Sequence, residues 1–137
     1  MTINDFYALA EKEGIEILDD DLPENGSVSV LLGGGDCVVG LDRHLSGPDL
    51  YEHLAHELGH CCRHAFYGIG CALSSREKQE NKAWEWAIKK TLPLGKIKKA
   101  FRHGDREAWQ IADRYDVSQT LVERAVSYYR SCGAICS

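Results

Sequence analysis

The N-terminal part of the chain combines one helical pattern with several short apolar runs. Residues 3–14 place apolar side chains on one face at helical spacing and end in Gly14, a residue type that commonly stops helices. Residues 15–18 form a short apolar run that favours a strand. Residues 28–32 and 37–41 are apolar runs on either side of a glycine-rich turn, which predicts a hairpin. We therefore expect a helix and a small, largely antiparallel sheet.

The remaining residues are patterned for helices. One helix is predicted to begin near Pro48, because proline fits a first turn and leucines follow at every fourth position. A second is predicted over residues 76–91, with Ser75 as its cap and a proline shortly after its end. Three further helices are predicted over residues 94–102, from a cap at Asp105 to residue 115, and from a cap at Ser118 to residue 129.

These elements predict an α+β fold, in which a small sheet packs with a central pair of helices and a helical C-terminal part. The 137 residues are enough for one domain with a core and too few to expect two. Within the domain, residues 1–47 would hold the first helix and the sheet, residues 48–93 the central helices, and residues 94–137 the C-terminal helices. No apolar run approaches the roughly 20 residues of a membrane span, and the acidic first helix is unlike a signal peptide. We expect a cytoplasmic protein without membrane contact.

Charge is distributed unevenly over the two halves. Residues 1–60 carry a formal charge of −11 and residues 61–137 carry +6, which gives the net −5 of the whole chain. The positive half could meet an acidic partner or a nucleic acid. Because it contains no run of five basic residues, we favour ordinary solvated faces of opposite bias.

The residues with the clearest chemical meaning are His56-Glu57-Leu58-Gly59-His60, an HExxH sequence. Residues four apart lie on one face of a helix, so both imidazoles can bind a single metal ion. Glu57 points in another direction, which suits it to act on a metal-bound water. This is the zincin arrangement, although the same letters also occur as two surface histidines on an ordinary amphipathic helix.

A hydrolytic zinc site usually has a third protein ligand. Glu80 is our candidate, since it lies three residues before Ala83 on the predicted inward face of the second helix. Glu77 and Glu85 are the alternatives on the same helix, one nearer its start and one on another face.

These residues resemble a known family. The HELGH motif, followed by Glu80-Asn-Lys-Ala83-Trp-Glu-Trp-Ala87 and Leu92-Pro93, is similar to the ImmA/IrrE family of zinc metallopeptidases, whose members carry an ExxA helix that supplies the third zinc ligand. The family usually has Asp or Asn after this alanine, where the present chain has Trp84. A contact that supports a metal ligand in relatives would then be missing or supplied by another residue.

The resemblance implies a zincin-like fold, with one Zn²⁺ held by His56, His60 and Glu80. Glu57 would take a proton from the bound water and deliver it to the leaving amine. The expected activity is cleavage of a protein substrate, a helix-turn-helix transcriptional repressor of a phage or mobile element. The alternative is a zinc-containing module that sequesters such a repressor without cutting it. Manganese or iron also suit two histidines and a carboxylate.

A second group that stabilises the oxyanion is left open. Tyr51, His53, His64 and Tyr67 are all near the motif in sequence. The longer metzincin pattern needs glycine and histidine at positions where this chain has arginine and phenylalanine, so we expect His64 to be peripheral.

The six cysteines show neither a CxxC pair nor a secretory context, so we expect most of them to be small, buried or idle thiols and no disulfide scaffold. Cys61 and Cys62 follow the second histidine directly and could approach the metal.

Two other hypotheses involve the binding of nucleotides or nucleic acids. Residues 33–35 are glycines but lack the lysine and the hydroxyl residue of a phosphate-binding loop. Residues 105–131 have a helix-turn-helix outline, yet its second helix carries only Arg124 and Arg130 as positive residues, beside Glu123. We do not expect direct nucleic-acid binding.

Overall fold

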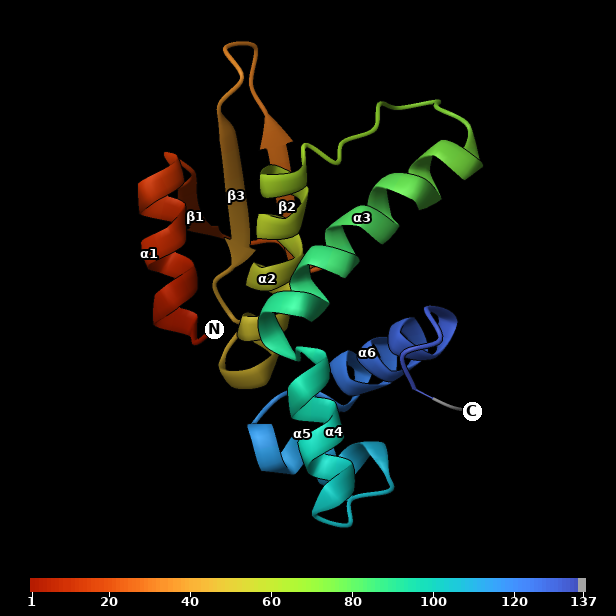
Figure 1. Cartoon of the computed structure of the whole chain (residues 1–137). Coiled ribbons are helices and arrows are strands. Elements are labelled where there is room, and N and C mark those ends of the chain that lie inside the picture. The colour runs from red at the N-terminus through yellow and green to blue at the C-terminus, as the bar shows by residue number, and fades with distance from the viewer. Residues whose placement is uncertain (136–137) are drawn as a thin grey trace.

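The computed structural model describes residues 1–135 and has the predicted α+β architecture (Figure 1). Its elements in chain order are α1 (Ile3–Glu13), β1 (Glu16–Asp20), β2 (Ser27–Leu31), β3 (Cys37–Asp42), α2 (Gly47–Arg63), α3 (Leu73–Thr91), α4 (Leu94–Arg102), α5 (Ala108–Tyr115) and α6 (Gln119–Ser131). Helix α1 lies beside the sheet, α2 and α3 occupy the centre, and α4 to α6 form the end opposite the hairpin tip (Figure 1).

The sheet is mixed, with strand order β1-β3-β2. Strands β2 and β3 form the predicted antiparallel hairpin, and β1 pairs with β3 in parallel. Strand β3 is central, and its alternate residues Cys37, Val39 and Leu41 are buried in the core. Strand β2 is therefore an edge of the sheet, and it packs against α2.

Strand β2 directs its valines toward solvent, opposite to the usual orientation of an amphipathic strand. Such strands normally bury their apolar face. Here Ser27 is buried, whereas Val28 and Val30 are 40% and 44% exposed. The serine face of β2 is consequently directed toward the interior, where it needs hydrogen-bond partners.

Two predicted helix starts are wrong. Helix α3 begins at Leu73 with Ala72 as its N-cap, so Ser75 lies in the first turn and is not the cap. Helix α5 begins at Ala108, after the predicted cap at Asp105, because the Asp105 carboxylate bonds the guanidinium of Arg114 at 2.6 Å.

The other helix boundaries agree with the sequence patterns, except that α6 extends beyond the predicted residue 129 to Ser131. Gly14 ends α1 in a left-handed conformation. Ser118 caps α6 by accepting a hydrogen bond from the Leu121 amide. Helix α2 begins after Ser46 with proline in its first turn, as expected.

Two hydrophobic clusters build the interior, and α3 connects them. The first joins α1, the sheet and α2 around Phe6 and Leu58. The second joins the end of α3 to α4, α5 and α6 around Leu92 and Leu121. Because α3 contributes to both clusters, its position fixes the C-terminal helices relative to the sheet.

Helices α2 and α3 come together at a glycine. A Cβ atom placed on Gly59 would lie 2.4 Å from the carbonyl oxygen of Ala83. Only glycine permits backbones to approach this closely. Glycine at the second variable position of the HExxH motif is thus a packing requirement between the two central helices.

Replacing this glycine should separate the helices. We expect Gly59→Ala to lower the free energy of unfolding by about 1–3 kcal/mol, because the clash involves backbone atoms that cannot rotate away. Urea denaturation would measure the change. Gly95→Ala is the matched control, since a Cβ at that exposed helix position meets nothing within 4 Å. An equal loss in both variants would contradict the packing argument.

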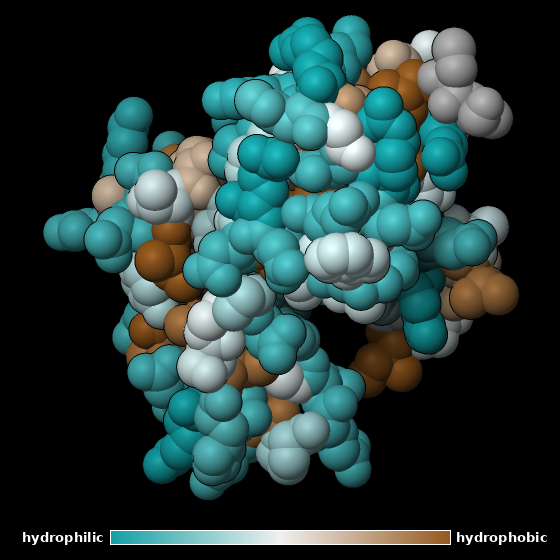
Figure 2. All heavy atoms as spheres, turned by 90° about the horizontal axis from the view of Figure 1, so that it is seen from below, coloured by the Kyte–Doolittle hydropathy of each residue, from teal (hydrophilic) through white to brown (hydrophobic). Residues whose placement is uncertain are grey.

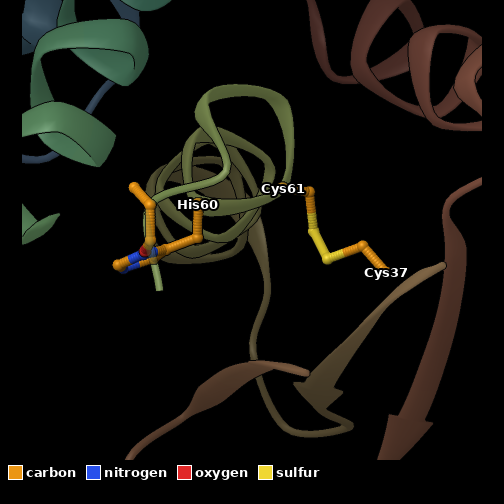
Figure 3. Close-up of a disulfide and its surroundings, with 4 residues drawn as sticks. Cys37, His60 and Cys61 are labelled. Carbon is orange, nitrogen blue, oxygen red and sulfur yellow. A yellow bond between two sulfur atoms is a disulfide. The ribbon is translucent and has the colours of Figure 1, made fainter. Parts of the chain in front are cut away.

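A disulfide joins Cys37 of β3 to Cys61 of α2. These two cysteines are buried, but the expectation that they are thiols is wrong, whereas Cys62, Cys71 and Cys132 are free. Cys136 lies outside the described residues. Figure 3 shows Cys61 directed toward Cys37, while His60 points away on another side of the helix. Cys61 is therefore held at the sheet and does not approach the predicted metal site.

The disulfide should contribute measurably to stability. It connects positions 24 residues apart, and closing a loop of that size stabilises by about 3 kcal/mol. We expect Cys37→Ser to unfold at lower urea concentration than wild type and to be insensitive to a phosphine reductant. Cys132→Ser, at an exposed free thiol, serves as the control. A wild-type midpoint that does not change on reduction would contradict the role of this bond.

The surface seen from the side of α4 and α5 is largely hydrophilic, with hydrophobic residues in small separate patches (Figure 2). Within residues 1–135, no helix combines the length and apolar composition that crossing a membrane requires.

Candidate metal centre

The structure brings the three predicted metal ligands together. His56 and His60 lie one turn apart on α2, and Glu80 faces them from α3. The Nε2 atom of His56 is 2.9 Å from Oε1 of Glu80, and Nε2 of His60 is 2.9 Å from Oε2 of the same carboxylate. These three residues could hold a metal ion. Neither alternative glutamate joins the group, since Glu77 is exposed and Glu85 pairs with Lys89.

His60 is oriented by the chain that follows its helix. Helix α2 ends at Arg63, and the capping residue His64 has a left-handed conformation with φ of 49°. This turn brings the carbonyl oxygen of Ala65 to the Nδ1 atom of His60. Because a carbonyl oxygen only accepts, Nδ1 carries the proton, and Nε2 is the nitrogen that faces Glu80. His64 has a structural role at the helix end, consistent with its expected peripheral position.

His56 is oriented by an aromatic side chain. The ring of Trp84 stacks on the imidazole with centroids 4.2 Å apart and planes 10° apart. The guanidinium of Arg124 lies 4.0 Å from the centroid of the Trp84 ring. Trp84 stands where the resemblance led us to expect Asp or Asn, so stacking supports the ligand here in place of a polar contact.

The charges at this centre favour a cation. Burial lowers the pKa of His56, but hydrogen bonds with Glu57 and Glu80 outweigh burial and raise it to about 9. At His60 burial also lowers the pKa, but hydrogen bonds with Glu80 and Ala65 outweigh burial and raise it. Burial raises the pKa of Glu80, but the two imidazoles lower it well below its usual value. The protons on the imidazoles thus lie between the ring nitrogens and the Glu80 carboxylate. A metal cation can take their place there.

The donor set also fits zinc in size. Zinc bonds of 2.0–2.1 Å in a tetrahedron space neighbouring ligand atoms by about 3.3 Å. The nitrogen–oxygen distances of 2.9 Å are only a few tenths of an ångström shorter. Two imidazoles and one carboxylate, with room for a water, match the ligand set of hydrolytic zinc sites.

Glu57 lies beside the candidate metal ligands and contacts both Ser27 of β2 and His56. It is 5% exposed, and its Oε2 atom accepts a 2.7 Å hydrogen bond from the hydroxyl of Ser27. The Nδ1 atom of His56 is 3.5 Å from the same oxygen. Burial raises the pKa of Glu57, but the bonds with His56 and Ser27 outweigh burial and lower it, which favours the carboxylate form.

A cavity of about 600 Å³ opens over these residues. Its walls come from β2, from α2 and α3, and from the segment after α2. Arg124 of α6 lies at its border and also lines a second cavity, of about 680 Å³, between α3 and α6. The two hollows are adjacent, because Trp84 and Arg124 belong to both.

The four candidates for oxyanion stabilisation are separated by their contacts. The hydroxyl of Tyr67 lines the cavity and donates to Glu80 at 3.2 Å. His53 also lines the cavity, but its Nδ1 atom is engaged with Ser27. Tyr51 donates to the carbonyl of Met1, and His64 lines a different hollow. Tyr67 is thus the candidate whose polar group reaches the metal ligands.

Sequence reasoning missed Ser27 and Arg124 as residues of this site. Ser27 belongs to the serine–valine alternation of β2, which does not reveal which face is buried. Arg124 lies on α6, far from the motif in sequence, and no local pattern connects it to α3.

Comparison with known proteins agrees with this geometry. A protein-family profile described as the IrrE N-terminal-like domain matches residues 10–127. This chain belongs to that peptidase family. No match was found among curated proteins. The resemblance inferred from HELGH and the Glu80 helix is therefore confirmed, and the family match covers both the metal-ligand helices and most of the C-terminal helices.

Metal analysis of variants would test the ligand set of this IrrE-like chain. We expect zinc affinity to fall at least about 100-fold in His60→Ala and Glu80→Ala, because each removes one of three protein ligands. Zinc content and competition with a chromophoric chelator would measure the change. Glu77→Gln is the control on the same helix, and Glu57→Gln should also retain the ion. Unchanged affinity in Glu80→Ala would contradict the third ligand.

Proposed function

We propose that this protein is a zinc-dependent endopeptidase. The observation that carries the proposal is the convergence of His56, His60 and Glu80 on one point, with the buried carboxylate of Glu57 beside them. A bound zinc ion would polarise a peptide carbonyl and lower the pKa of a water toward about 7. Membership of a peptidase family supports this use of the site.

The chain's own residues divide the remaining work. Glu57 accepts a proton from the attacking water and donates it to the leaving amine, as its position beside the ligands allows. With Glu80 engaged as a metal ligand, the hydroxyl of Tyr67 would turn from that carboxylate and donate its hydrogen bond to the substrate carbonyl oxygen as negative charge develops there. His60 and His56 stay fixed through Ala65 and Trp84 while this happens.

The substrate would bind as an extended peptide along β2. This strand is an edge of the sheet and contributes Ser27, Val28 and Ser29 to the cavity. An edge strand has free backbone groups that can pair with another chain. Paired in this way, a peptide would run past the metal ligands toward Trp84 and Arg124.

As the substrate we propose a helix-turn-helix repressor of a phage or mobile element, in line with the resemblance. Direct DNA binding by α6 has less support. The start of this helix is engaged within the protein, because Ser118 and Thr120 both donate to the carboxylate of Glu52. A recognition helix would need that end free for base contacts.

Cleavage of a purified helix-turn-helix repressor by the zinc-loaded protein would test the proposal. We expect Glu57→Gln to retain zinc and to lower the cleavage rate by about 10²–10⁴-fold, because a general base in this role contributes that much. Tyr67→Phe should reduce the rate constant with little change in zinc content. Mass spectrometry of the products would locate the cut.

The same experiment discriminates against the sequestering alternative. If the wild type binds the repressor and blocks its activity without producing fragments, the protein is a non-cleaving module and not a peptidase. If the wild type holds no zinc, the proposed function is wrong at its foundation.

A further inference from the structure

The buried serine face of β2 leads directly to the side chain of Glu57. Ser27 is 8% exposed, and its hydroxyl oxygen contacts two partners. It lies 2.7 Å from Oε2 of Glu57 and 2.8 Å from Nδ1 of His53. Ser27 therefore links Glu57 of α2 to His53, which lies one turn earlier on the same helix.

The direction of the hydrogen bonds follows from the number of protons. An ionised carboxylate only accepts, so the single proton of the Ser27 hydroxyl is donated to Glu57. The serine oxygen must then accept from His53, which therefore carries its proton on Nδ1. The chain of donors runs in one direction, from His53 to Ser27 to Glu57.

The backbone around His53 is built to admit its ring. Gly26 precedes β2 with φ of +73°, a conformation that side chains rarely adopt. A Cβ atom on Gly26 would lie 2.8 Å from Cε1 of His53. The ring therefore lies against the backbone just before Ser27, and this contact restricts where His53 can point.

We propose that Ser27 and His53 are positioning residues for Glu57. Ser27 holds one carboxylate oxygen, so that the other remains available to a water or ligand at the metal centre. His53 holds Ser27 in the rotamer that donates to Glu57. The inference rests on the proposed peptidase function, and it explains why β2 buries Ser27 and exposes its valines.

The structure also separates this role from metal binding. Neither Ser27 nor His53 belongs to the group of His56, His60 and Glu80. Loss of Ser27 should accordingly leave metal binding intact and change only the orientation of the Glu57 carboxylate. A residue needed merely for folding would not produce that separation.

Acetohydroxamate binding to the cobalt(II)-loaded protein provides the test. This probe chelates the metal and gives up a proton to a neighbouring base, and cobalt reports the binding in its visible absorption. We expect Ser27→Ala to keep cobalt affinity within about twofold and to weaken acetohydroxamate binding at least about tenfold, since hydrogen bonds to charged groups contribute on that scale. Ser27→Thr should recover most of the affinity, because it restores the hydroxyl.

His53 supplies a second, independent pair of variants. His53→Asn keeps a donor near the Nδ1 position and should bind acetohydroxamate close to wild type, whereas His53→Leu should resemble Ser27→Ala. Ser75→Ala, at an exposed position of α3, controls for the loss of a serine hydroxyl. Wild-type affinity in both Ser27→Ala and His53→Leu would overturn the proposal.

Nuclear magnetic resonance of the metal-free protein adds a readout that needs no metal. Long-range ¹⁵N–¹H spectra should show His53 protonated at Nδ1 in wild type and in Ser75→Ala, and should show this preference lost in Ser27→Ala. A wild-type His53 protonated only at Nε2 would overturn the hydrogen-bond chain. Failure of the wild type to bind cobalt or zinc would instead overturn the proposed function, so the two failures are distinguishable.

Discussion

The contact between Gly59 and Ala83 is the constraint on which the site depends. It sets how closely α2 and α3 approach, and α2 carries the two histidines while α3 carries Glu80. A wider separation would take the carboxylate out of reach of the imidazoles, because a metal ion tolerates only small changes in ligand distance. Two further interactions hold the helices in place. Helix α2 is joined to β3 by a disulfide, and α3 is embedded in both hydrophobic clusters.

Each functional side chain around the cavity is fixed by a different kind of partner. His60 is held by a backbone carbonyl, His56 by the stacked ring of Trp84, and Glu57 by a serine hydroxyl. These partners come from separate elements, so that no single local segment could build the site. Such support restricts rotation of the ligands and is the arrangement expected of a preorganised metal centre.

Three carboxylates border the same cavity, and their partners give them different roles. Glu80 faces two imidazoles and is suited to bind a cation. Glu57 accepts a hydrogen bond from a serine hydroxyl and stays ionised beside them. Glu52 accepts from two hydroxyls at the start of α6 and anchors that helix at the cavity. The chemical type of the residue is the same in all three cases, and the surroundings decide its use.

The sequence by itself determined most of the elements and the three candidate metal ligands, because both depend on local spacing. The four-residue interval in HELGH places the histidines on one helix face, and helical periodicity also placed Glu80 on the inward face of α3. Most helix ends and the hairpin followed from capping residues and apolar runs.

Tertiary structure decided what local spacing cannot express. Helix α5 starts late because Asp105 has a distant partner in Arg114, and Cys61 forms a disulfide because folding brings Cys37 beside it. Strand alternation defines two faces without saying which is buried, so only packing against α2 turned Ser27 toward Glu57. The pairing of Trp84 with His56 and Arg124 likewise arises where three helices meet, and sequence separation carries no information about such contacts.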